Sequence, residues 1–242
     1  MTKKEMTALL DNIRAEVKRI DVPANRMDMQ RFFKEKLKNP ITIRSAVLHK
    51  LSNEFFKRVK HLPKKDILDF CDFILATDFR FRRFFAFEWA GKLHTQYLKS
   101  DFTRFEFWLK TYVNNWGVHD HLAQSFGHLL HDYPELLPKV KRFAKSKNMW
   151  LRRMSAVALI YPVRKGKYLD DIFTTSDILL RDQEDLVQKG YGWTLKEAGN
   201  VYPDEVFAYV MRNKKDMPRT ALRYAIEKYP PDMRKKAMKK DW

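Results

Sequence analysis

Five short segments of this sequence share a local pattern and recur at nearly constant intervals. They are spaced 30 to 37 residues apart and read RFFAFEWAG, DHLAQSFGH, RMSAVALIY, KGYGWTLKE and RTALRYAIE, beginning at Arg83, Asp120, Arg153, Lys189 and Arg219. Such a period is typical of helical hairpins that stack side by side, because one hairpin cannot bury its apolar face alone. The spacing predicts an α-solenoid of HEAT-like helical repeats, in which one helix of each pair lines a concave groove.

Local patterns favour the same all-α fold. Residues 6–20, 45–59 and 64–78 each place apolar side chains at i, i+3, i+4 and i+7. Only seven glycines occur, and no long alternating apolar–polar run suggests a sheet. Prolines, Pro162 and Pro203 among them, fall between the periodic segments. Because no Ser/Gly-rich linker divides the chain, we expect residues 1–242 to form a single domain.

The charge balance indicates the class of partner. The chain has 48 Lys and Arg against 30 Asp and Glu, a net charge of +18, and 45% of its residues are hydrophobic, as in a folded protein. An excess of this size favours a polyanion, with nucleic acid first and an acidic membrane surface second. A solvated basic surface without a partner is the alternative.

Other features bear on location and cofactors. The N-terminal segment MTKKEMTALLDNIR contains charges from its third residue, and no apolar run approaches the ~18 residues of a membrane span. Cys71, the single cysteine, lies in an apolar stretch and is expected to be a buried thiol in an intracellular, cytoplasmic protein. His128 and His131 share a helix face without further ligands, so we expect neither a metal nor a cofactor.

The repeat frame places a candidate site on the predicted basic groove. Trp116 lies four residues before Asp120 and Trp193 four after Lys189, so each pair shares a helix face. With Arg153 these residues would gather on one surface, inside a wider basic lining that includes Arg80, Arg82, Arg83 and Arg219. The alternative is structural: tryptophans such as Trp89 and Trp108 usually belong to the core, and an Asp near an Arg is usually a plain ion pair.

Two histidines flank Asp120 in the sequence, His119 and His121. Adjacent residues of a helix point in different directions, so we predict no catalytic Asp–His pair here.

Three segments, NNWGVHDHL, MWLRRMSAVAL and LVQKGYGWTLKEAGNVYPDEV, resemble segments of the AlkD-like DNA alkylation repair glycosylases. The resemblance runs in order over most of the chain and is strongest from about residue 110 to 210. It implies a HEAT-like-repeat protein that releases N3- and N7-alkylated purines from double-stranded DNA. Carried over residue by residue, the family pattern makes Asp120 catalytic and Trp116, Arg153 and Trp193 DNA-contacting. Lys189 and Arg83 join these as expected DNA-binding residues from the repeat frame.

The sequence departs from the family pattern at three places. Gly117 follows Trp116 where an acidic residue is frequent, and Val118-His119 precedes Asp120 where a small residue and a valine are expected. Some members also provide an N-terminal aromatic residue near the DNA, a role that Phe32 or Phe33 could fill.

A single carboxylate in a basic groove suits one particular reaction. A purine alkylated at N7 or N3 carries a fixed positive charge and leaves as a neutral base, so no general acid is needed. What needs stabilising is the cationic sugar, and an ionised Asp120 would do this or orient the attacking water. The sequence therefore predicts a monomeric alkylpurine DNA glycosylase, associated with the nucleoid during repair. The alternatives are a non-catalytic HEAT-like protein that recognises unusual DNA structure and a solenoid that binds acidic proteins.

Overall fold

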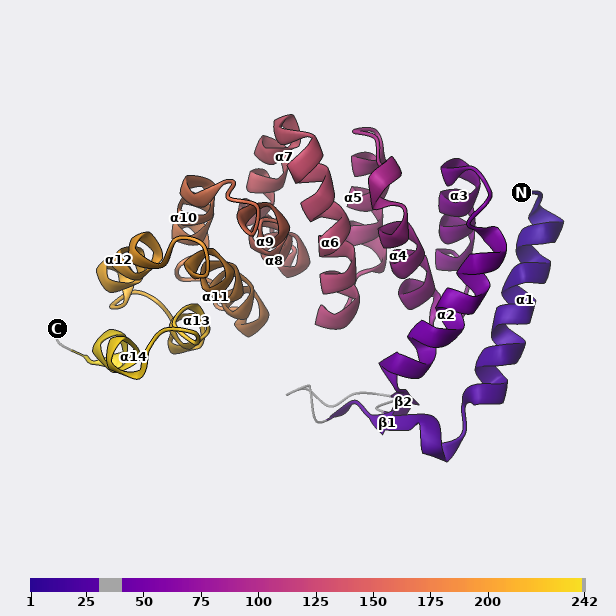
Figure 1. The fold of residues 1–242 in the computed structure, drawn as a ribbon, viewed down its shortest axis with the longest axis horizontal. Coiled ribbons are helices and arrows are strands. Elements are labelled where there is room, and N and C mark those ends of the chain that lie inside the picture. Colours follow the sequence, from indigo (N-terminus) through magenta and orange to yellow (C-terminus); the bar gives the residue numbers. More distant parts are fainter. Residues whose placement is uncertain (31–40, 241–242) are drawn as a thin grey trace. The chain divides into compact units, whose positions relative to one another are not determined.

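The structure, a computed structural model, describes residues 1–30 and 41–240. The chain packs as two compact units, Met1–Leu93 and His94–Trp242. Figure 1 shows each unit to be built almost wholly of helices. The all-α prediction is confirmed. The single-domain prediction and the basic concave groove, which would span both units, stay predictions.

In the described residues of the first unit, 1–30 and 41–93, four α-helices make up most of the chain. Its elements are α1 (Lys3–Ile20), η1 (Pro23–Asn25), β1 (Arg26–Asp28), β2 (Ile41–Ile43), α2 (Ser45–Val59), α3 (Lys64–Leu75) and α4 (Arg82–Lys92). Helix α1 begins at a capping box, in which the Thr2 hydroxyl accepts from the Glu5 N–H and the Glu5 carboxylate accepts from the Thr2 N–H. The three helical ranges predicted from apolar spacing correspond to α1, α2 and α3.

The core of the first unit is aromatic and centres on Trp89. This side chain is fully buried, and its indole N–H donates to the Ser52 hydroxyl at 3.0 Å. The rings of Phe70 and Phe85 lie against it, with centroids 5.4 and 6.5 Å away. The core position predicted for Trp89 is confirmed, as is the burial of Cys71.

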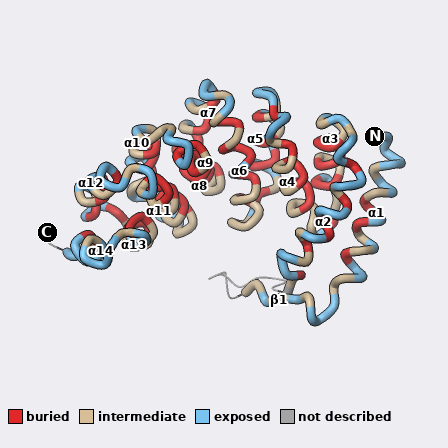
Figure 2. The backbone as a smooth tube through the Cα atoms, viewed as in Figure 1, coloured by how far each residue is buried: buried red, intermediate tan, exposed pale blue. Residues whose placement is uncertain are grey.

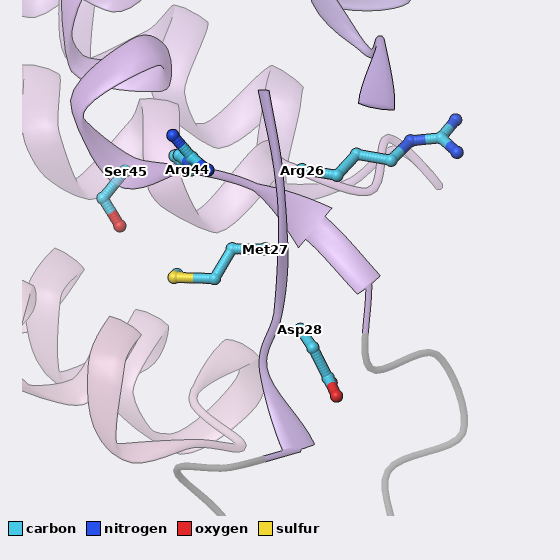
Figure 3. A pocket seen from close by; sticks show the side chains of 5 residues that line it. All are labelled: Arg26, Met27, Asp28, Arg44 and Ser45. Atoms are coloured by element: carbon cyan, nitrogen blue, oxygen red, sulfur yellow. The ribbon is translucent and has the colours of Figure 1, made fainter. Parts of the chain in front are cut away.

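A two-stranded antiparallel ribbon was not predicted from the sequence. Strand β1 pairs with β2 in the register Arg26 to Ile43 and Asp28 to Ile41. A pocket of about 570 Å³ beside the ribbon is lined by Arg26, Met27, Asp28, Arg44 and Ser45. Figure 3 shows Arg26 and Met27 extending to opposite sides of β1, as successive strand residues do. Phe32 and Phe33, the predicted N-terminal aromatics, lie outside the described residues.

The second unit is a stack of helices. Its elements are η3 (His94–Gln96), α5 (Asp101–Tyr112), α6 (Trp116–Asp132), η4 (Pro134–Leu136), α7 (Leu137–Arg142), η5 (Phe143–Lys145), α8 (Met149–Val157), α9 (Ile160–Val163), α10 (Leu169–Leu179), α11 (Asp185–Gly199), α12 (Pro203–Asn213), α13 (Arg219–Ala225) and α14 (Pro231–Met238). Helices α6, α8, α11 and α13 pack on one another in that order, while α5, α7 and α10 cover α6, α8 and α11. Figure 2 shows α11 mostly buried and α14 mostly exposed.

The predicted repeats are confirmed in this stack, since each predicted segment of the second unit begins on one of its four successive helices. The small residues of the pattern allow close packing. A Cβ added to Gly192 of α11 would come within 2.7 Å of the Ala221 carbonyl oxygen on α13. The core position predicted for Trp108 is also confirmed. One detail is wrong: Pro162 lies inside the four-residue helix α9 and not between helices.

A series of tyrosine hydroxyls links each repeat to the one before it. Four tyrosines donate to main-chain carbonyl oxygens 26 to 38 residues earlier, at 2.8 to 3.0 Å. The pairs are Tyr133 with Tyr97, Tyr168 with Leu130, Tyr202 with Gly166 and Tyr229 with Pro203. We call this series the tyrosine ladder. Among the helices of residues 1–30 and 41–240, none has the length and apolar character needed to span a bilayer.

Candidate active site

Two asparagine caps set the register of the candidate site. The Asn115 side chain accepts from the Val118 N–H at 3.1 Å and begins α6, and the Asn148 side chain accepts from the Trp150 N–H at 2.8 Å and begins α8. Satisfying the free N–H groups of the first turn fixes where each helix starts. Asp120 and Arg153 occupy the same position after their caps, which brings them level on the packed helices.

Asp120 and Arg153 form a close ion pair across α6 and α8. Arg153 Nη2 donates to both carboxylate oxygens at 3.0 Å, and Nε donates to Oδ1 at 3.3 Å. Nη1 of the same guanidinium donates to the Leu186 carbonyl oxygen on α11. The Arg153 side chain is only 6% exposed, whereas that of Asp120 is 21% exposed. The Asp120 side chain therefore reaches solvent, whereas that of Arg153 is almost wholly covered.

Gly190 provides the space for this guanidinium. A Cβ at this position of α11 would lie 3.1 Å from Arg153 Cγ and 3.2 Å from Nη1. Both distances are tighter than ordinary van der Waals contact, so a larger residue would press on the arginine. Arg153 is thus held between α6 and α11.

His119 also contacts the Asp120 carboxylate, a contact that was not expected from the sequence. Its Nδ1 lies 2.8 Å from Asp120 Oδ1, and its Nε2 lies 3.2 Å from the Trp150 carbonyl oxygen. The expectation that adjacent helical residues cannot meet is wrong for this pair. The buried imidazole turns its near nitrogen toward the carboxylate, so the two side chains meet although their Cα–Cβ bonds diverge.

The surroundings hold Asp120 in its ionised form. Burial opposes ionisation, but the hydrogen bond with His119 and the charge of Arg153 outweigh it, so the pKa of Asp120 lies below its usual value. Burial lowers the pKa of His119, and the charge of Arg153 acts in the same direction. At neutral pH the site contains a carboxylate, a neutral imidazole and a guanidinium.

Trp193 lies on α11 and is held by a carboxylate of its own helix. Its indole N–H donates to Glu197 Oε1 at 3.1 Å, and Arg164 Nε donates to Glu197 Oε2 at 3.0 Å. These contacts fix the indole nitrogen of a half-buried side chain. Glu197 and Arg164 were not predicted as part of the site.

The remaining predicted residues lie on the expected helices. Trp116 is the first residue of α6, one turn before Asp120. Lys189 of α11 pairs with Asp185 at 2.7 Å, one turn earlier on the same helix. Arg83 is half-buried on α4 of the first unit, so its place near Asp120 stays a prediction.

The structure thus brings Asp120 and Arg153 into contact, and it places Lys189 and Trp193 on the helix that packs against α8. The DNA-binding roles of all these residues stay predictions. What differs from expectation is the setting of Arg153, which is buried and bound to Asp120 and Leu186. The sequence did not predict that three further residues belong to the site: His119, Gly190 and Glu197. The one signal was at His119, which stands where the family pattern has a valine.

Fold and site together define a class, namely strongly basic helical-repeat proteins that present one ionised carboxylate held over a buried arginine. The sequence profile of a family described as "DNA alkylation repair enzyme" matches residues 13–229. This chain belongs to that family.

Solved structures with the same fold have low sequence identity to this chain. A predicted DNA alkylation repair enzyme from Enterococcus faecalis is 17% identical with a TM-score of 0.68, covering 78% of this chain and 87% of its own. AlkD2 from Streptococcus mutans is 17% identical with a TM-score of 0.58, covering 90% and 99%. The protein smu.31 from S. mutans UA159 is 19% identical with a TM-score of 0.57, covering 76% and 93%. The search of curated protein sequences returned no match.

Proposed function

We propose that this protein is a monofunctional DNA glycosylase that releases N3- and N7-alkylated purines from duplex DNA. The observation that carries the proposal is Asp120, an ionised and partly exposed carboxylate in a chain of net charge +18. A negative charge among cations opposes the binding of phosphates, so it is costly to a protein that only binds DNA. It is useful where positive charge develops on the sugar during bond cleavage.

The surroundings of Asp120 suit this role. A lesion that already has a positive charge departs as a neutral base, so the site needs no proton donor on the leaving group. The neutral His119 and the buried Arg153 both donate to the carboxylate and keep it ionised in advance of the reaction. A carboxylate held in place before the reaction costs no reorganisation in the transition state. In this proposal water is the nucleophile and Asp120 orients it.

The proposed partner is double-stranded DNA, bound mainly through phosphates. Neutralising Z phosphates gives a log–log salt slope of about −0.9Z, so affinity should fall steeply as salt is added. Trp116 and Trp193 would provide flat surfaces against the sugar, and an indole face attracts a cationic base by about 0.5–2 kcal/mol.

The test is release of free base from duplexes that contain either a cationic or a neutral non-standard base at one position. The protein should release 7-methylguanine faster than spontaneous depurination does. It should not release uracil, because uracil is a neutral base and has no positive charge that weakens its glycosidic bond. Normal salt-sensitive DNA binding without release of 7-methylguanine would replace this proposal with the non-catalytic alternative. Equal release of both bases would contradict the charge argument.

A further inference from the structure

His119 is fully buried, yet both of its ring nitrogens face oxygen atoms. Nδ1 lies 2.8 Å from Asp120 Oδ1 and Nε2 lies 3.2 Å from the Trp150 carbonyl oxygen. A carboxylate and a carbonyl only accept hydrogen bonds, and a neutral imidazole has one N–H to donate. The shorter contact and the charge of the carboxylate favour the tautomer with the proton on Nδ1. The side chain therefore donates to Asp120.

The donors around the Asp120 carboxylate are unequally divided between its two oxygens. Oδ1 receives His119 Nδ1 at 2.8 Å, Arg153 Nη2 at 3.0 Å and Arg153 Nε at 3.3 Å. Among the residues that the structure describes, Oδ2 receives only Arg153 Nη2, at 3.0 Å. A carboxylate oxygen has two lone pairs, so those of Oδ1 are used and Oδ2 keeps one for another partner.

We propose that His119 is a positioning residue for the reaction, whose Nδ1–H anchors Asp120 Oδ1 so that Oδ2 is the oxygen presented to the sugar and to the attacking water. The inference rests on the proposed glycosylase function. It assigns different tasks to the two oxygens of one carboxylate.

Arg153 alone fixes the orientation of the carboxylate weakly, because its one contact that distinguishes the two oxygens, Nε to Oδ1 at 3.3 Å, is the longest of the set. Its Nη2 is equidistant from the two oxygens, so moderate rotation about the Cβ–Cγ bond of Asp120 would preserve an interaction with it. A second donor from His119, attached to the neighbouring residue of α6, makes one rotation preferable. Because the imidazole is neutral, it orients the carboxylate without adding a positive charge that would cancel part of its effect on the sugar cation.

Three substitutions separate the donor from the packing. His119→Asn places an amide N–H where Nδ1 stands, His119→Gln places one near Nε2, and His119→Phe keeps a buried ring without a donor. We expect the single-turnover rate of 7-methylguanine release to fall by about 10- to 100-fold in the Phe and Gln variants, the scale for one hydrogen bond to a charged group. The Asn variant should recover most of that loss. Thermal melting of all three variants identifies the temperature at which each is folded.

A second readout does not depend on turnover. The ¹³C resonance of the Asp120 carboxyl group should titrate at higher pH in His119→Phe than in wild type, and the acidic limb of the rate–pH profile should move with it. An Asn variant as slow as the Gln variant, or an unchanged Asp120 titration in the Phe variant, would overturn the inference while wild-type base release keeps the glycosylase function intact. Absence of base release by the wild type would instead defeat the function and the inference with it.

Discussion

Asp120→Asn removes one negative charge and almost no volume, but it also takes the charged partner from a buried arginine. The Arg153 side chain is 6% exposed, and the Asp120 carboxylate is its charged partner. Removing one partner of a buried ion pair costs about 3–5 kcal/mol, because the other charge stays buried without compensation. The asparagine oxygen still accepts from Arg153, so we expect a loss near the lower end, about 3 kcal/mol. For a chain of this size, this lowers Tm by about 6–12 °C.

The effect on catalysis should be larger than the effect on folding. Losing one preorganised electrostatic group costs about 10²–10³-fold in rate, so release of 7-methylguanine should fall at least that far at a temperature where the variant is folded. DNA affinity should stay equal or increase, since a carboxylate opposes phosphate binding. Single-turnover base release, DNA binding and thermal melting on the same preparation give the three quantities.

Asp182→Asn is the matched control. Asp182 holds Arg152 by two hydrogen bonds, at 2.6 and 3.3 Å, and both side chains are largely buried. This variant should lose a similar amount of stability and keep the wild-type rate of base release when folded. If Asp120→Asn releases 7-methylguanine as fast as wild type, Asp120 is only an ion-pair partner of Arg153. Equal rate losses in both variants would show that the loss reflects general destabilisation.

Three further measurements test other parts of the structure. Gly190→Ala should press on Arg153, lower base release about 10-fold and cost about 1–3 kcal/mol of stability. Its control is Gly91→Ala, whose Cβ would meet no atom of the described residues within 4 Å; this variant should keep the wild-type rate and stabilise α4 by about 0.5–1 kcal/mol. Tyr202→Phe removes a hydroxyl from the tyrosine ladder and should lower the unfolding free energy by about 0.5–1.5 kcal/mol in urea titrations. Burial lowers the pKa of His128 from 6.5 to about 4. As the pH falls from 6.5 toward 4, the unfolded chain therefore binds a proton that the folded chain does not, and the unfolding free energy should decrease. His128→Gln should make this decrease smaller.

The parts of the fold that depend on periodicity could be predicted from the sequence. The apolar spacing of residues 45–59 defines α2 because one face of a helix must be buried. The contact between Asp120 and Arg153 follows from the repeat, since equivalent positions of successive repeats lie side by side. Three-residue strands such as β1 are too short to show a period, so the ribbon was missed.

The details of the site depend on burial, which residue type alone does not show. Arginine is usually exposed, so Arg153 was expected at the surface; its place between α6 and α11 depends on the missing side chain of Gly190. The contact of His119 with Asp120 depends on side-chain torsion angles that neighbouring helices restrict. The spacing of residues in the sequence does not predict those torsion angles.

The tyrosine ladder also affects how this protein can tolerate sequence change. Each hydroxyl donates to a main-chain carbonyl, and every residue type has one. A substitution on the accepting repeat therefore leaves the link available, and only loss of the tyrosine removes it. Each of these repeats carries its own tyrosine donor and offers a carbonyl acceptor to the next repeat. If a whole repeat were inserted or deleted at one of these junctions, the new neighbours could therefore form the same hydrogen bond.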